Sequence, residues 1–150
     1  MYDEKDLKIL NLLQNDARIT NAEIARQVEM APSAVLERIR KLEEKGIISG
    51  YEAKIDNNKL NLGLTAFLSI KTADRAGEIT TALEISKIPE VQEVHHVAGD
   101  DCYLIKVKAK DNQALAKLMR EKLGQISSIT STKTTIVLET VKESSKIPLA

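Results

Sequence analysis

This chain is poor in the features that mark secreted and membrane proteins. It has one cysteine among 150 residues, which excludes an intrachain disulfide framework and suits a reducing compartment, so we expect a cytoplasmic protein. No apolar run is long enough to span a bilayer, and the start MYDEKD lacks the apolar centre of a signal peptide. We therefore expect neither a membrane protein nor a secreted one.

The chain also lacks an excess of either charge. Lys plus Arg and Asp plus Glu each number 22, so the formal net charge is zero. Indiscriminate binding to polyanions depends on net positive charge. Any DNA binding must therefore come from a local cationic face, doubled by dimerisation. A hydrophobic content of 43% beside 29% charged residues describes a soluble globular protein of one or two small domains.

Motifs that carry catalysis are absent as well. The chain has no glycine-rich phosphate loop, Walker pattern or nucleophile elbow, so we expect no enzymatic activity and no cofactor. Five possible metal ligands lie within eight positions: His95, His96, Asp100, Asp101 and Cys102. Neighbouring strand residues point to opposite faces, however, and these are the only two histidines. Ordinary strand residues beside a polar turn therefore explain the cluster better than a metal site or a nucleophilic cysteine.

Residues 20–46 contain the strongest structural signal in the chain. Thr20 and Glu23 have the spacing of a capping box, which begins a helix. Pro32 then marks the first turn of a second helix, and Gly46 ends it. The apolar positions of the two helices recur at helical spacing: Ile24, Ala25, Val28, Val35, Ile39 and Leu42. This pattern predicts a helix-turn-helix whose second helix enters a DNA major groove.

The outer face of the second helix is cationic, which separates this pair from an ordinary helical hairpin. Residues facing away from the apolar stripe are the candidates for DNA contact. We expect Ser33, Arg38 and Lys41 to read the operator, since an outward Arg can donate two bonds to guanine. Arg40 lies nearby for a phosphate. The full candidate set is Asn21, Ser33, Ala34, Glu37, Arg38, Arg40 and Lys41.

A further helix is predicted before this motif. Asp3 is placed to cap a helix that runs to about Asn15. The apolar residues expected to join the core of the helix-turn-helix are Leu7, Leu10, Leu13 and Ile19. Beyond Gly46, residues 47–55 alternate in polarity and predict an extended segment or a small wing.

The second half of the chain changes to the two-residue period of β-strands. Strands are predicted at 64–71, 91–98, 102–110 and 131–141, and helices at about 75–87 and 111–124. The order β-α-β-β-α-β is that of a ferredoxin-like domain, with both helices on one face of a four-stranded antiparallel sheet. No segment remains to cover the other face, which carries Phe67 and Leu104. We therefore expect a second subunit to cover it.

An RNA-recognition domain has the same order of elements. Such domains stack bases on aromatic residues of their central strands. The third predicted strand offers only Tyr103, and the whole chain has one Phe and no Trp. The RNA alternative is therefore disfavoured.

Two segments carry a family resemblance that spans both halves. The run RIRKLEEKGIISGY at 38–51 and the turn VAGDDCYL at 97–104, within this order of elements, resemble the Lrp/AsnC family of bacterial and archaeal transcriptional regulators. The resemblance covers about residues 2–142. It implies a homodimer formed through the C-terminal sheet domain, commonly assembled into octamers, that binds amino acids or related metabolites between those domains. The implied effector site comprises His96, Gly99, Asp100, Asp101, Cys102 and Thr135.

The chain departs from the family pattern at three places. Glu29 stands in the helix-turn-helix turn where the family usually has Gly. A non-Gly residue in a left-handed turn costs about 1 kcal/mol, so the turn is free to take another shape. Ala31 stands where a capping Ser is common, which weakens the start of the second helix. Asp101 and Cys102 replace an aromatic-Asp pair, so leucine is not assumed as the effector.

The sequence thus predicts an α+β protein that acts as a sequence-specific transcriptional regulator, with double-stranded DNA and an amino acid or related metabolite as its partners. The alternatives are an amino-acid-binding regulatory subunit of an enzyme, or an architectural protein that compacts DNA with little sequence preference. The predicted division is a winged helix-turn-helix domain at 1–50, an extended linker at 51–63, a ferredoxin-like ligand-sensing and oligomerisation domain at 64–142, and a tail at 143–150.

Overall fold

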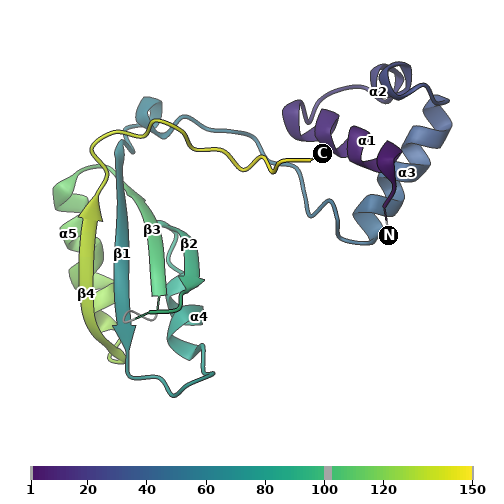
Figure 1. Cartoon of the computed structure of the whole chain (residues 1–150). Coiled ribbons are helices and arrows are strands. Elements are labelled where there is room, and N and C mark those ends of the chain that lie inside the picture. Colours follow the sequence, from purple (N-terminus) through teal and green to yellow (C-terminus); the bar gives the residue numbers. More distant parts are fainter. Residues whose placement is uncertain (1, 100–102, 150) are drawn as a thin grey trace. The chain divides into compact units, whose positions relative to one another are not determined.

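The computed structural model of this chain describes residues 2–99 and 103–149. The chain forms two compact units. The first comprises residues 1–54 together with 142–150, and the second comprises residues 55–141 (Figure 1). The division falls inside the predicted linker, and the C-terminal tail belongs to the helical unit. Across the described residues, no helix is long and apolar enough to cross a membrane.

Three helices make up the first unit, at the positions that the caps and the apolar spacing predict. They are α1 (Glu4–Asn15), α2 (Asn21–Val28) and α3 (Pro32–Glu44). Pro32 occupies the first turn of α3, and Gly46 follows that helix with a positive φ of 72°. Residues 47–55 are all described and contain no β-strand, so no strand of a wing forms there.

The helix caps differ from the prediction in one respect. Thr20 caps α2 by accepting from the backbone N–H of Glu23 at 3.1 Å. The side chain of Glu23 does not reach back, because it accepts bonds from Arg26 and Gln27 instead, so the predicted capping box forms only half. The complete capping box lies at α1, where Asp3 and Asp6 each accept from the other's backbone N–H.

The core of the first unit corrects the predicted stripe of α1. Ile9 is fully buried and Leu13 nearly so, whereas Leu7 and Leu10 are only half-buried. The helix carries enough apolar residues for two overlapping stripes, and the burial of Asp6 one turn before Ile9 selects the second. The buried cluster is Ile9, Leu13, Ile24, Ala25, Val28, Val35 and Ile39, with Leu12, Ile19, Met30 and Ile48 packed against it.

The turn between α2 and α3 keeps a left-handed shape despite its missing glycine. Glu29 has φ 55° and ψ 54°, and its N–H donates to the carbonyl of Ala25. The turn therefore keeps its left-handed conformation. Glu29 is strained there, because its Cβ makes unfavourable contacts in a conformation that favours glycine.

The second unit contains the predicted β-α-β-β-α-β order. Its strands are β1 (Leu64–Thr72), β2 (Val91–His96), β3 (Tyr103–Ala109) and β4 (Ile129–Ile136). Its helices are α4 (Thr80–Ser86) and α5 (Asn112–Glu121), with short 3₁₀ helices η1 (Asn57–Leu60) and η2 (Leu123–Gln125). The strand order is β2-β3-β1-β4 with every pair antiparallel, which confirms the ferredoxin-like prediction.

One face of this sheet packs against the two helices (Figure 1). Side chains alternate along β1 and β3, so one set is fully buried while the neighbours face the other way. The buried set on these strands is Ala66, Leu68, Ile70, Tyr103, Ile105, Val107 and Ala109. The other face, called the open face below, carries Phe67 and Leu104 among Thr, Ser and Lys side chains.

The largest boundary errors in this unit are at the start of α4 and the end of β4. α4 begins at Thr80 rather than near 75, because Asp74 accepts from both the N–H and the hydroxyl of Thr81 and holds residues 73–79 as a loop. β4 ends at Ile136 rather than 141, since the last bond of this ladder runs from the N–H of Val137 to Thr65. The β propensity of single residues does not show where the partner strand β1 begins, so it does not locate the end of β4.

Candidate DNA interface and effector region

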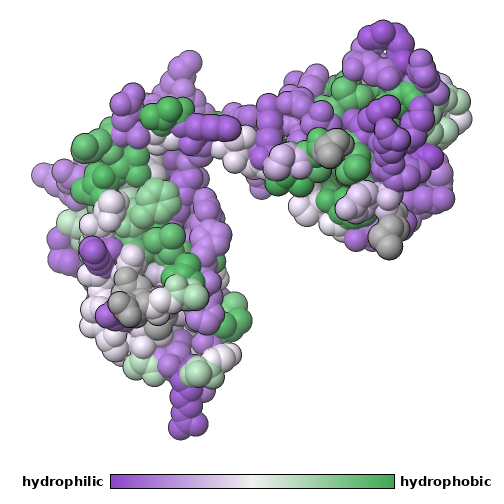
Figure 2. All heavy atoms as spheres, in the orientation of Figure 1, coloured by the Kyte–Doolittle hydropathy of each residue, from purple (hydrophilic) through white to green (hydrophobic). Residues whose placement is uncertain are grey.

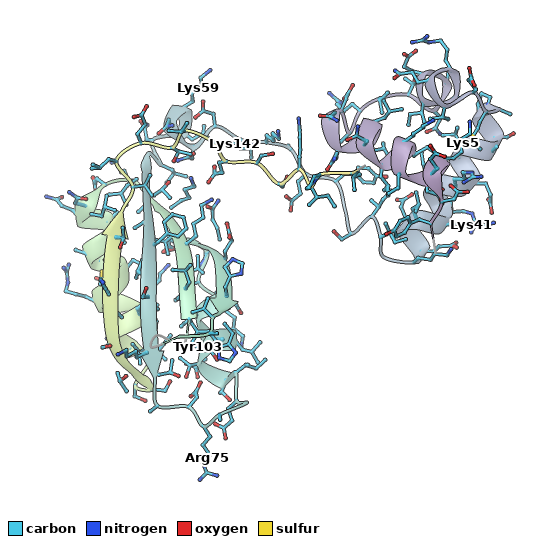
Figure 3. The ribbon with its side chains drawn as sticks, in the orientation of Figure 1. Lys5, Lys41, Lys59, Arg75, Tyr103 and Lys142 are labelled. Carbon is cyan, nitrogen blue, oxygen red and sulfur yellow. The ribbon has the colours of Figure 1, made fainter. Side chains whose placement is uncertain are left out.

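The outward face of α3 carries both signs of charge. Ser33, Glu37, Arg40 and Lys41 are exposed, as predicted, and Lys41 is labelled in Figure 3. Arg40 pairs with Glu37 at 2.5 Å and also with Glu44, while Lys41 lies 3.9 Å from Glu37. The hydrogen bond from Arg40 holds the pKa of Glu37 below its ordinary value. These exposed pairs exchange readily for water or phosphate because each contributes little to stability.

Arg38 does not share this outward position. Its Nη1 donates to both carboxylate oxygens of Asp3 at 2.8 Å and to Asp6 Oδ1 at 3.1 Å. This contact, called the Arg38 clamp below, turns the guanidinium toward the start of α1 and leaves its side chain 31% exposed. The bond from Arg38 also holds the pKa of Asp3 below its ordinary value. Arg38 was predicted to read a base, but in this structure its guanidinium is hydrogen-bonded to Asp3 and Asp6 of the same unit.

The two remaining candidates lie at helix starts. Asn21 opens α2 and Ala34 lies in the first turn of α3; both are half-buried. Ala31 precedes α3 and makes no side-chain cap, and its backbone carbonyl accepts from the N–H groups of Ala34 and Val35.

Sequence reasoning missed two residues that fix the first unit. Asp6 is 9% exposed and completes the Arg38 clamp. Lys5 donates to the carbonyl of Val28 at the end of α2, where a cation is favoured by the unpaired carbonyls (Figure 3). A signal was available for Asp6, because it lies at helical spacing from Ile9 and Leu13 on the buried stripe and a buried carboxylate requires a cation.

The predicted effector residues are divided between two parts of the sheet. Asp100, Asp101 and Cys102 lie outside the described residues. His96 ends β2 on the helix-covered face, where its ring centroid lies 5.1 Å from that of Tyr103. Thr135 pairs with Phe67 on the open face of β4. β2 and β4 are opposite edges of the sheet, roughly 14 Å apart at the usual strand spacing, so one chain does not bring His96 and Thr135 together.

A buried polar cluster anchors the loop beside this region. The hydroxyl of Thr81, which is 1% exposed, lies 2.8 Å from Asp74 Oδ1 and 2.6 Å from Ser128 Oγ. The hydroxyl of Tyr103 donates to the carbonyl of Glu78 at 3.3 Å. These bonds fix residues 73–79 next to the start of β3, which follows directly on the predicted effector turn.

The open face carries a small charge network. Glu93 lies 2.8 Å from His95 Nε2 and 3.5 Å from Lys106 Nζ, and the contact with His95 lowers the pKa of Glu93.

Tyr103 is 2% exposed on the other face, so it is not available to stack a base. Over residues 2–99 and 103–149, no group of three or more His, Cys, Asp and Glu side chains is arranged to hold a metal ion.

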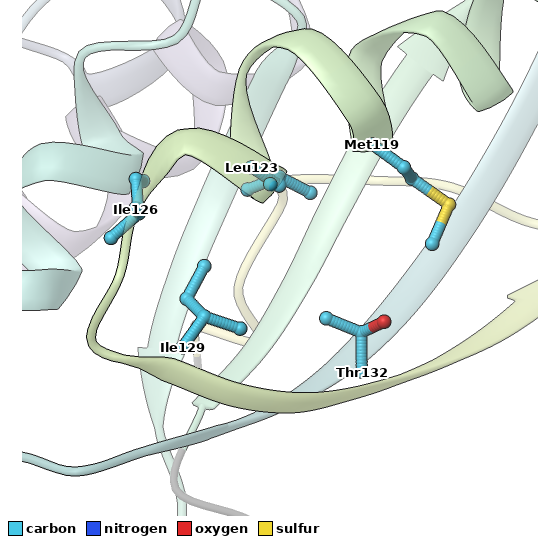
Figure 4. Close-up of a pocket in the computed structure, with 6 residues that line it drawn as sticks. Met119, Leu123, Ile126, Ile129 and Thr132 are labelled. Atoms are coloured by element: carbon cyan, nitrogen blue, oxygen red, sulfur yellow. The ribbon is translucent and has the colours of Figure 1, made fainter.

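The second unit also has a small cavity between the end of α5 and β4 (Figure 4). Its volume is about 140 Å³, and it is lined by Met119, Leu123, Gly124, Ile126, Ile129 and Thr132. None of these six described residues is charged. The cavity therefore fits a small apolar group and offers no partner for the two charges of a free amino acid.

Comparisons with known proteins match both units. Residues 2–49 match a winged helix-turn-helix DNA-binding family, and residues 65–147 match the Lrp/AsnC ligand binding domain. The leucine-responsive regulatory proteins of Escherichia coli K12 and Salmonella typhimurium are each 37% identical to this chain over 147 residues, covering 97% of it and 90% of the relative.

Solved structures agree with these matches. A transcriptional regulator of Neisseria meningitidis in complex with L-Met is similar with a TM-score of 0.92 and 29% identity, covering 99% of this chain and 97% of that one. E. coli AsnC is similar with a TM-score of 0.90 and 27% identity, covering 99% of both chains.

Proposed function

We propose that this chain, which belongs to the Lrp/AsnC family of transcriptional regulators, recognises its operators through α3 and changes its affinity for them when it binds an amino acid or a related small metabolite. The observation that carries the proposal is the helix-turn-helix α2–α3, with an exposed polar face on α3 that includes Arg40 and Lys41. A recognition helix reads bases from its N-terminal residues and contacts phosphates around them.

The structure refines which side chains we propose for each role. Ser33 and Lys41 are exposed and are the proposed base readers. Arg40 is the proposed phosphate contact, since the acids that pair with it are themselves exposed. Arg38 has a third role, in which the clamp fixes the angle of α3 against α1 and so sets the position of the other two.

We propose that the effector binds at the turn formed by residues 99–102, between subunits. The support is a ligand-binding-domain match over residues 65–147 and a relative crystallised with L-Met. Carboxylates at Asp100 and Asp101 are suited to pair with an amino group, and N–H groups near Gly99 are suited to receive a carboxylate. Because His96 and Thr135 lie on opposite edges of one sheet, a site that contains both takes them from different chains.

We also propose that the protein assembles as a homodimer and then as an octamer. Several exposed apolar residues of the second unit lie close in sequence to the start of β1 or the end of β4: Leu60, Leu62, Ile136, Leu138 and Val141. Apolar surface around this end, near η1, appears green in Figure 2. Contiguous apolar surface of this kind marks subunit contacts. The proposed regulator acts in the cytoplasm and has no enzymatic activity.

Fluorescence anisotropy with a fragment of the protein's own promoter and a random duplex of equal length tests this function. We expect the protein to bind the promoter fragment more tightly than the random duplex, and this preference to persist as the salt concentration rises. We also expect at least one amino acid of a panel to change the affinity for the promoter fragment. Equal affinity for both duplexes would favour the DNA-compacting alternative. Heat of amino-acid binding without any DNA binding would favour the regulatory-subunit alternative.

Calorimetry with the same panel locates the effector site. We expect Asp100→Ala to abolish the heat of binding, because the proposed site uses that carboxylate. Binding that persists unchanged in Asp100→Ala would place the effector elsewhere in the protein.

A further inference from the structure

The C-terminal tail is held by the side chain of one residue on α1. The amide of Gln14 donates from Nε2 to the carbonyl of Ile147 at 2.8 Å, and its Oε1 accepts from the N–H of Ile147 at 3.0 Å. Both polar ends of one side chain thus bind the backbone of one residue. Gln14 Nε2 also donates to Asn11 Oδ1 at 3.0 Å, which fixes the direction that the amide faces.

This pattern recognises an extended backbone. The N–H and C=O of one extended residue point to the same side, as in a hydrogen-bonded pair of an antiparallel sheet. A primary amide offers one donor and one acceptor at the matching spacing. Ile147 is suited to this conformation because it is β-branched and precedes Pro148, and both features favour extended backbone. The N–H of Lys146 donates to the hydroxyl of Ser144 at 3.1 Å just before the contact.

The contact lies within the helical unit, to which the C-terminal tail belongs. Residues 142–150 belong to the helical unit, so the chain passes between the two units twice, once after Lys54 and once after Val141. The second passage starts a few residues beyond β4, which carries Thr135, a predicted effector residue.

We propose that Gln14 is a docking site for the chain's own extended segment at Ile147, and that this contact couples the ligand-binding unit to the recognition helix. The coupling runs from β4 through the tail to the last turn of α1. It then runs along α1 to the Arg38 clamp, where Asp3 and Asp6 hold α3. The coupling rests on the proposed function, because it requires an effector response to transmit; the docking does not.

Two variants of the full-length protein test the proposal. Gln14→Leu removes both bonds to Ile147 and preserves an apolar stem of similar size. Gln27→Leu is the matched control, because Gln27 is an exposed helical glutamine whose amide donates only to a carboxylate on its own helix, Glu23. Hydrogen–deuterium exchange of the C-terminal peptide reads the docking directly, and Pro148 simplifies the signal because it has no N–H.

We expect Gln14→Leu to speed exchange at Ile147 by at least tenfold and Gln27→Leu to leave it unchanged. Exchange that is the same in Gln14→Leu and in the wild type would overturn the docking. Exchange that accelerates in the wild type on dilution, in step with subunit dissociation, would assign the docked segment to a second copy and overturn an intrachain contact.

DNA binding with and without L-leucine or L-methionine tests the coupling. We expect Gln14→Leu to reduce the effector-induced change in affinity to less than half of the wild-type change, with the affinity of the unliganded protein within twofold. An unaltered effector response, together with faster exchange at Ile147, would overturn the coupling while leaving the docking in place. If no amino acid changes the DNA affinity of the wild type, the effector part of the proposed function is overturned, and the coupling with it. The exchange rate at Ile147 would still decide the docking.

Discussion

Arg38 on the recognition helix donates to both carboxylate oxygens of Asp3, the residue that caps α1, across 35 positions of sequence. Asp3 and Asp6 form a capping box with each other and hold Arg38 at the same time. The start of one helix and the outer flank of another are therefore joined by a single charged network. This network is one of the contacts that link α3 to α1.

The first prediction separates positioning from reading at α3. Arg38→Met should destabilise the protein by about 1 kcal/mol, since it leaves the clamp carboxylates without their cation, and should weaken binding to specific and random duplexes alike. Lys41→Met should leave the thermal midpoint unchanged and weaken binding to the operator by about 1–3 kcal/mol, with little effect on the random duplex, because Lys41 is a proposed base reader. Anisotropy and thermal melts measure both. A specific loss of about 1–3 kcal/mol in operator binding alone, without destabilisation, would show instead that Arg38 reads a base.

The second prediction concerns acid stability. The bond from Arg38 depresses the pKa of Asp3 below its ordinary value of 3.8 in the folded state. A depressed carboxyl pKa stabilises the folded state fully above the unfolded value and ceases to do so as pH falls through the folded value. Wild-type stability should therefore fall as the pH drops below about 4, and Asp3→Asn should flatten that part of the curve. Parallel curves for the two proteins in urea titrations between pH 5 and pH 2.5 would contradict the assignment.

The third prediction tests the strain at the helix-turn-helix turn. Glu29 has a left-handed backbone with φ 55°, which costs a residue with a Cβ about 1 kcal/mol. Glu29→Gly should therefore stabilise the protein by up to about 1 kcal/mol, although glycine also gives the unfolded chain more freedom. Glu29→Ala is the control, because it removes the charge but keeps the Cβ. Equal stabilisation by Gly and Ala in chemical denaturation would assign the effect to charge.

The fourth prediction concerns the end of α5. A Cβ at Gly124 would lie 2.9 Å from the backbone carbonyl oxygen of Met119, closer than such atoms approach without movement of the chain. Gly124→Ala should destabilise the protein by about 1–3 kcal/mol, as overpacking does. Gly50→Ala is the control, since a Cβ there meets nothing within 4 Å. Equal unfolding midpoints for these two variants would remove the close approach as a constraint.

The fifth prediction addresses assembly. Leu138 is 100% exposed beside other apolar residues at the end of β4, and burying such a side chain in an interface contributes about 1.5–3 kcal/mol. The wild type should have a mass in light scattering well above the 16.6 kDa of one chain. Leu138→Glu should raise the dissociation constant of the assembly at least tenfold. Leu36→Glu, at an exposed leucine of α3, should leave the mass unchanged. A wild-type monomer at micromolar concentration would contradict the proposed assembly.

The sequence by itself determined the elements whose signals are local. A cap such as Asp3 or Thr20, a proline in a first turn and a glycine after a last one act on residues within one turn of themselves. The starts of α1, α2 and α3 were therefore predictable. The two-residue alternation from Tyr103 to Ala109 likewise depends only on strand geometry, so a strand at this place was predictable.

Only the tertiary structure decided the relations between distant residues. Ile9 is buried in the core of the first unit while Leu7 and Leu10 are half-buried, and no local pattern identifies Arg38 as the partner of Asp6, 32 positions away. His96 and Thr135 lie on opposite edges because the strand order is β2-β3-β1-β4. The contact of Gln14 with Ile147 spans 133 positions. Propensity and periodicity describe neighbours along the chain, whereas burial, pairing and docking depend on which surfaces meet when the chain closes on itself.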